Sequence, residues 1–98
     1  MAIRYTRDYD HILDDLSRAL LTVPQFYEAF EMEQVEWDAL QKEEQEVCVR
    51  TLADDLFYML GAENTAVIGS GTAEYDPSRS LIRVTASEQL IHIIALRE

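Results

Sequence analysis

The residues best suited to metal chemistry in this chain are histidine and aspartate side chains at helical spacing. His11, Asp14 and Asp15 stand at positions i, i+3 and i+4, so they share one face of a helix and could together bind a divalent cation. That face lies opposite the apolar stripe of the same segment and points to solvent. The adjacent pair Asp54-Asp55 has no converging ligand either. We therefore predict no metal site and no cofactor.

Pairs of glutamates three residues apart are a second candidate for magnesium chemistry. Hydrolytic sites of this kind need a second set of carboxylates that converges on the first. No Glu-x-x-Asp follows the Glu-x-x-Glu pairs here, so a metal-dependent enzyme is the weakest of the functions considered. The pairs are Glu28 and Glu31, Glu33 and Glu36, and Glu43 and Glu46.

Two further features resemble parts of catalytic sites. The segment Gly69-Ser70-Gly71-Thr72 is rich in glycine, but a phosphate-binding loop ends at a helix N-terminus, often with a lysine, and this one lies inside a strand pattern. It predicts a β-bulge. His92 alternates with apolar neighbours and has no nucleophile in a suggestive context, which favours a structural histidine. We predict no catalytic residue, so the chain is expected not to be an enzyme.

The charge balance limits the partners of the chain. The sequence has 98 residues, the length of a single domain (1–98), with a formal net charge of −11. Residues 1–62 carry 14 acidic and 5 basic residues, whereas residues 63–98 carry 5 acidic and 3 basic residues. This balance disfavours direct binding to nucleic acid or to an anionic membrane, because both require basic side chains. It suits a basic partner.

The cysteine content and the apolar runs indicate a compartment. Cys48 is the single cysteine, so no disulfide can form within the chain. No segment has the length and apolar character of a signal peptide or of a membrane span. A lone thiol fits a reducing environment, and we expect a cytoplasmic protein.

The composition changes near Gly61-Ala62, which predicts an α+β fold with a helical part (1–61) and a β part (62–98). We expect about three helices packed on a three-stranded antiparallel meander. The segment 24–60 is too long for one helix in a domain of this size, and breaks are expected near 31–33 and 40–42. The expected helices are Arg7–Leu21, one that begins at Pro24, the short segment Gln34–Leu40, and Glu43–Leu60 with Gly61 as its stop; the expected strands are Thr65–Tyr75, Ser80–Thr85 and Leu90–Arg97.

Aromatic residues gather on the short helices in the middle of the chain. Such a group packs in the core by default, but exposed rings would form the centre of a partner interface. Trp37 and Phe30 are the anchors that we expect at that interface. The candidate interface residues are Phe26, Tyr27, Phe30 and Trp37.

The last strand is apolar on both faces, although a simple meander places it at an edge of the sheet. Native proteins usually cover an apolar edge, so either the N-terminal segment or a second subunit is expected there. We predict a homodimer through the C-terminal sheet. The candidate dimer residues are Leu90, His92, Ile94 and Leu96.

These observations favour a small acidic protein that acts by recognising another protein, as an interaction or regulatory module. The alternative is an acidic DNA mimic that inhibits a nucleic-acid-binding protein by occupying its basic groove. A mimic requires two rows of carboxylates spaced like phosphates and a steep dependence of binding on salt.

Overall fold

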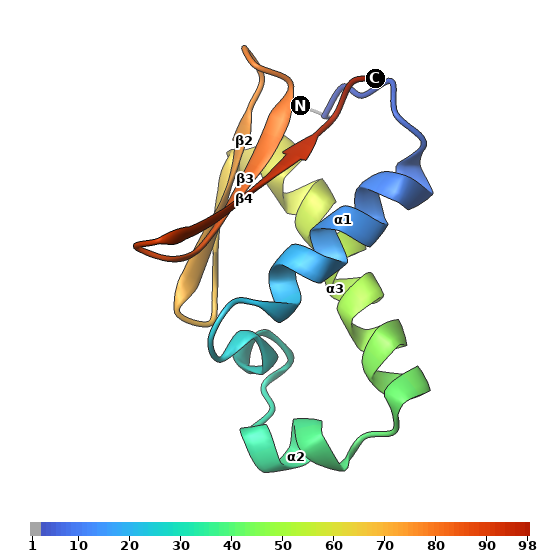
Figure 1. Cartoon of the computed structure of the whole chain (residues 1–98), viewed down its shortest axis with the longest axis vertical. Coiled ribbons are helices and arrows are strands. Elements are labelled where there is room, and N and C mark those ends of the chain that lie inside the picture. The colour runs from blue at the N-terminus through green and yellow to red at the C-terminus, as the bar shows by residue number, and fades with distance from the viewer. Residues whose placement is uncertain (1–2) are drawn as a thin grey trace.

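The computed structural model describes residues 3–98 as two layers, with helices covering one face of a four-stranded antiparallel sheet (Figure 1). The α+β class is as predicted, but the sheet has four strands and not three. The helices are α1 (Tyr9–Leu21), the 3-10 helix η1 (Phe26–Phe30), α2 (Gln34–Ala39) and α3 (Lys42–Glu63); the strands are β1 (Thr65–Ile68), β2 (Gly71–Asp76), β3 (Leu81–Ser87) and β4 (Leu90–Ala95).

Helix α1 begins two residues later than predicted because Asp8 caps it. The Asp8 carboxylate accepts hydrogen bonds from the backbone amides of Asp10 and His11. The apolar stripe of the helix is buried, and Ile12, Leu16 and Leu20 are completely inaccessible to solvent. The periodicity therefore identified both this helix and its buried face.

Helix α3 is the longest element, with 22 residues. A capping box starts this helix. The Glu44 carboxylate accepts a hydrogen bond from the Gln41 amide, and the Gln41 side chain accepts one from the Glu44 amide. The predicted stop at Gly61 is wrong. The helix continues to Glu63, and Asn64 ends it in a left-handed conformation (φ 68°), with its amide bonded to the carbonyl of Leu60.

The segment after α1 also differs from the prediction. The helix expected from Pro24 is a short 3-10 helix, with left-handed residues, Gln25 and Glu31, on either side. Helix α2 matches the predicted short segment to within one residue. No helix in residues 3–98 is long and apolar enough to cross a lipid bilayer.

The predicted strand Thr65–Tyr75 is two strands joined by a tight turn at Gly69-Ser70, so the predicted bulge is wrong. Ile68 pairs with Gly71 across this turn. Gly69 has φ +54°, and a Cβ atom there would overlap the carbonyl oxygen of Gln25. The Ser70 amide and hydroxyl both bond to the Pro24 carbonyl, at 3.1 and 3.0 Å. The turn is thus seated against the loop before η1.

The core lies between the helices and the inner face of the sheet. Helix α3 packs over β1 and β2, and α1 packs over β3 and β4. Buried and accessible side chains alternate along β2 and β3, as expected for a sheet with one covered face. The large side chains of the sheet layer that are fully buried are Ile82, Val84, Ile94 and Leu96.

The N-terminal segment covers the end of edge strand β4. The backbone amides of Thr6 and Arg7 donate to the Leu96 carbonyl at 2.9 and 3.2 Å. The Arg7 guanidinium also donates to the Ala95 carbonyl at 2.8 Å. Of the two covers expected for this edge, the N-terminal segment is therefore present, at the C-terminal end of β4.

The close approach at Gly69 gives a stability prediction. We expect Gly69→Ala to lower the free energy of unfolding by about 2 kcal/mol or more, because the left-handed backbone and the overlap with Gln25 both oppose a side chain. Thr72→Ala, on the next strand with its side chain exposed, should cost about 1 kcal/mol or less. Urea denaturation monitored by circular dichroism measures both. Equal costs would contradict the role assigned to this turn.

Candidate functional site

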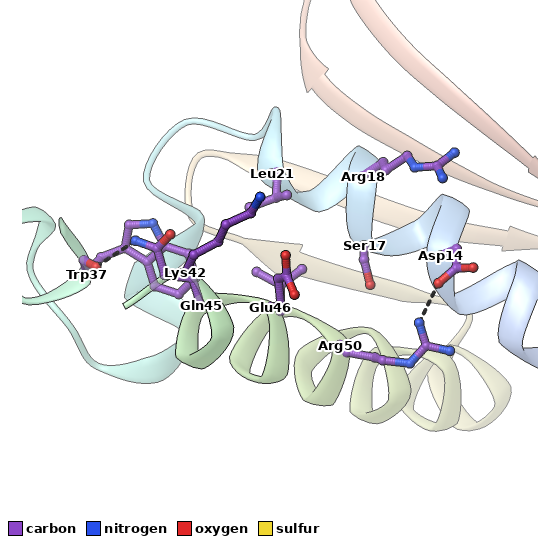
Figure 2. Close-up of a pocket in the computed structure, with 10 residues that line it drawn as sticks. Asp14, Ser17, Arg18, Leu21, Trp37, Lys42, Gln45, Glu46 and Arg50 are labelled. Carbon is purple, nitrogen blue, oxygen red and sulfur yellow. Dashed lines mark hydrogen bonds and ion pairs between the residues drawn. The ribbon is translucent and has the colours of Figure 1, made fainter. Parts of the chain in front are cut away.

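A groove of about 500 Å³ lies between α1 and the first turns of α3, with α2 closing one end (Figure 2). This helical groove has the volume of a typical site for a small molecule or for one or two side chains of a partner. Its lining comes from three helices. The lining residues are Asp14, Ser17, Arg18 and Leu21 of α1, Trp37 of α2, and Lys42, Gln45, Glu46, Val49 and Arg50 of α3.

The orientation of α2 relative to α3 is fixed by hydrogen bonds. The Gln45 side chain donates to the Trp37 carbonyl at 2.9 Å and so connects the two helices. Helix α2 has its own capping box, in which the side chains of Glu33 and Glu36 satisfy amides of the first turn. These contacts place the Trp37 ring at the end of the groove.

The wall of the groove near α2 is apolar. The Trp37 ring meets Phe26 edge to face, with ring centroids 4.8 Å apart, and lies parallel to Phe30 at 6.0 Å. Leu21 is half exposed at the rim, and Val49 is buried at the base. The aromatic packing holds the wall in place, so the groove does not have to form when a ligand binds.

The predicted aromatic interface divides into two parts. Phe26 and Trp37 are 7% and 8% exposed and belong to the core. Tyr27 and Phe30 are partly buried and pack against it. The small accessible part of Trp37 lines the groove. A partner contact at this cluster stays a prediction, and the structure restricts it to the groove side of Trp37 and to the edges of Tyr27 and Phe30.

The other end of the groove is polar and is built around Arg50. Its guanidinium donates to the Asp14 carboxylate and, at 3.1 Å, to the Asp10 carboxylate, which ties α3 to α1. The hydrogen bond from Arg50 holds the pKa of Asp14 below its usual value, and the same bond raises the pKa of Arg50. Both groups are therefore charged at neutral pH.

The carboxylates considered for metal binding have other partners. Asp14 binds Arg50, and Asp15 binds Arg7 at 3.0 Å. Asp54 accepts a hydrogen bond from the Tyr9 hydroxyl, and together with burial this bond raises the pKa of Tyr9. Among residues 3–98, no group of three or more histidine, cysteine or acidic side chains is placed to hold a metal ion.

Three polar groups of the groove are free of partners within residues 3–98. The Ser17 hydroxyl oxygen is buried without a hydrogen bond. The Lys42 ammonium and the Glu46 carboxylate are exposed, and neither takes part in an ion pair. Figure 2 shows Ser17 directed from α1 toward α3, and Lys42 and Glu46 directed back toward α1. The groove thus combines an apolar wall with an ammonium, a carboxylate and a hydroxyl.

The groove adjoins an acidic stretch of the chain, which we call the acidic end. It comprises residues 28–46, in η1, α2 and the start of α3 (Figure 1). This stretch holds eight acidic residues and a single base, Lys42, and all nine side chains are exposed. The acidic residues are Glu28, Glu31, Glu33, Glu36, Asp38, Glu43, Glu44 and Glu46.

The remaining predicted residues lie in the sheet, away from the groove. His92 is half buried on β4, with its Nε2 3.0 Å from the Thr22 hydroxyl oxygen. Ile94 and Leu96 of the predicted dimer strand are 2% and 0% exposed, so they serve the core of the single chain. Leu90 is 41% exposed.

No family model, curated protein or solved structure matches this chain.

The link between Arg50 and Asp14 gives a pH prediction. Because the pKa of Asp14 lies below its value in the unfolded chain, the link stabilises the fold at neutral pH, and this contribution is lost as pH falls below about 4. In Arg50→Gln we expect the Asp14 pKa to rise toward the ordinary aspartate value, measured by carboxyl NMR titration. Arg79→Gln, in the β2–β3 turn, should leave it unchanged; an unchanged value in Arg50→Gln would contradict the assignment.

The buried Ser17 hydroxyl gives a second prediction for this site. Ser17→Ala removes a buried polar group that has no partner, so we expect the free energy of unfolding to rise by about 1 kcal/mol. Thr51→Ala, at an exposed position of α3, controls for the gain in helix propensity alone. Thermal and urea denaturation compare the two variants. A loss of stability in Ser17→Ala would mean that the hydroxyl is hydrogen-bonded in the folded protein.

Proposed function

We propose that this protein is a non-enzymatic interaction module that binds a basic segment of a partner protein in the helical groove. The observation that carries the proposal is the position of the groove: its apolar wall at Trp37 lies next to the acidic end, which also contributes Lys42, Gln45 and Glu46 to the lining. The lining itself is mixed in charge, with Arg18, Lys42 and Arg50 against Asp14 and Glu46, so the excess of carboxylates lies beside the groove. An apolar recess next to an acidic surface is suited to a basic segment that also carries an apolar side chain.

The acidic end supplies the long-range attraction. Eight exposed carboxylates within 19 residues produce a negative potential that draws a basic segment toward the groove. This attraction reaches about 10 Å at 0.1 M salt and weakens as the ionic strength rises. It raises the rate of association and orients the partner more than it adds to the final affinity.

The groove supplies the short-range contacts. An apolar side chain of the partner would pack against Trp37, Leu21 and Val49, which are held by the aromatic packing and the helix core. The free Glu46 carboxylate would pair with a lysine or arginine next to that side chain in the partner's sequence. The exposed Lys42 ammonium can donate to a carbonyl of the bound segment.

The acidic end also supports the alternative, a DNA mimic that occupies the basic groove of a nucleic-acid-binding protein. The two functions differ in what DNA does to the complex. A mimic competes with DNA for its target, so added duplex DNA should release the target. A partner bound through an apolar side chain in the helical groove should remain bound.

Capture from the native lysate with matched variants tests the proposal. Glu46→Lys reverses a charge inside the groove, and Glu88→Lys makes the same change in the β3–β4 turn. Leu21→Ser removes an apolar contact at the rim, and Val35→Ser removes one on α2 outside the groove. We expect Glu46→Lys to weaken capture of the partner by about tenfold, equivalent to about 1.4 kcal/mol, and Leu21→Ser by several-fold.

The two control variants should capture the partner as the unchanged protein does, and circular dichroism should show that all four variants fold. Equal capture by all four would contradict the proposal. Loss of the partner in both charge variants, together with its release by DNA, would favour the mimic.

A further inference from the structure

The outer face of the sheet is not covered by any helix of residues 3–98. Helices α1 and α3 pack on the inner face, and α2 and η1 lie beyond the sheet on the helix side (Figure 1). The outward side chains alternate with the buried ones along each strand. Three large apolar side chains among them are strongly exposed: Val67 is 77%, Ile91 51% and Ile93 55% exposed.

The strand register places these residues in two rows across the sheet. Val67, Thr72, Thr85 and Ile91 are successive cross-strand neighbours from β1 to β4. In the adjacent row, Glu74 and Arg83 form an ion pair at 2.8 Å, and Ile93 follows on β4. Apolar side chains on the outer strands are thus Val67 of β1 and Ile91 and Ile93 of β4, with Thr65 as the second outward residue of β1. The central strands carry Thr72, Thr85, the ion pair and, at the start of β3, the half-buried Leu81. Such rows are able to interdigitate with another sheet.

This face is also electrically balanced, unlike the rest of the protein. Glu74 is neutralised by Arg83, and Asp76 at the end of β2 pairs with Arg79 at 3.9 Å. The whole chain carries a formal charge of −11. A second copy therefore meets strong repulsion wherever it approaches the acidic helices, but not at the outer face of the sheet.

We propose that the outer face of the sheet binds the outer face of a second copy of this chain, forming a homodimer with two stacked sheets. A symmetric dimer requires a surface that complements itself, and a neutral face with Glu74 beside Arg83 meets this condition because each can also pair with the other in the second copy. Apolar residues from β1 and β4 are then removed from water. The contact uses Ile91 and Ile93 of β4, in place of the inward Ile94 and Leu96.

The area of the face sets the strength of the dimer. Four strands spaced by about 4.8 Å, each about 20 Å long, give a footprint of roughly 400 Å² per subunit. Stable dimers usually bury about 800 Å² per partner, so this one should be weak, with a dissociation constant in the micromolar range. Since the helix layers lie on the opposite faces, the dimer would present its two helical grooves on opposite sides.

Sedimentation equilibrium over a range from about 10 μM to 1 mM, at about 0.15 M salt, tests the proposal. We expect the mass to rise from 11.3 kDa toward the value for two chains. Ile93→Lys and Val67→Lys should each weaken the dimer more than tenfold, because they introduce charge on the outer face. Val35→Lys makes the same change of charge on α2 and should leave the dimer intact.

Three outcomes would overturn the proposal. A mass of 11.3 kDa at every concentration would show that this face does not bind a second copy. Equal weakening by Val35→Lys would place the contact elsewhere or make it purely electrostatic. An effect of Ile93→Lys without one of Val67→Lys would show edge pairing through β4 instead of stacked sheets, since Val67 lies on β1 at the opposite edge.

Discussion

Helix α3 is longer than the sheet against which it packs, and the position of the groove depends on this difference. Its 22 residues extend over about 33 Å, whereas the six residues of β2 or β4 extend over about 20 Å. The first turns of α3 therefore project past the sheet. Of their apolar side chains, Val49 is buried, whereas Val47 is 65% exposed. The helices α1 and α2 do not cover these turns completely, and the groove is the space left between them and α3.

The same difference in length separates the charged surface from the neutral one. The projecting turns of α3, together with η1 and α2, form a small lobe in which most side chains face water, and eight carboxylates lie there. The sheet has a single open face, and its charges occur in pairs. The protein thus has two surfaces of different character: an acidic end beside a groove with an apolar wall, proposed to bind a basic partner, and a neutral sheet face, proposed to bind a second copy.

Local sequence patterns predicted the elements whose stability comes from local signals. Helix α1 follows from its apolar periodicity and the Asp8 cap, and the antiparallel meander follows from alternating β-branched residues between turn residues. The errors have two causes, a distant contact at Gly69 and a nearby cap after Gly61. Gly69 forms a turn because the Pro24-Gln25 loop packs against it, and Gly61 continues the helix because Asn64 ends it instead.

The sequence predicted the candidate site only in part, because residues that are distant in the chain form it. Trp37 was identified as an important aromatic residue, but its groove is completed by Leu21, Ser17 and Val49 of other helices. No local pattern marks these three residues, since their common surface exists only when α1 and the projecting part of α3 lie side by side. The outward position of Ile91 and Ile93 likewise requires the register of β4, which a strand apolar on both faces does not reveal.

The helical groove is the surface that we propose recognises a partner. Photo-crosslinking from within the groove tests it most directly, with a photoreactive amino acid at position 46 and, as the reference, at position 88 in the β3–β4 turn. After irradiation in the native lysate, we expect a discrete adduct with one other protein from position 46 and none from position 88. The same adducts from both positions, or none from position 46, would contradict it.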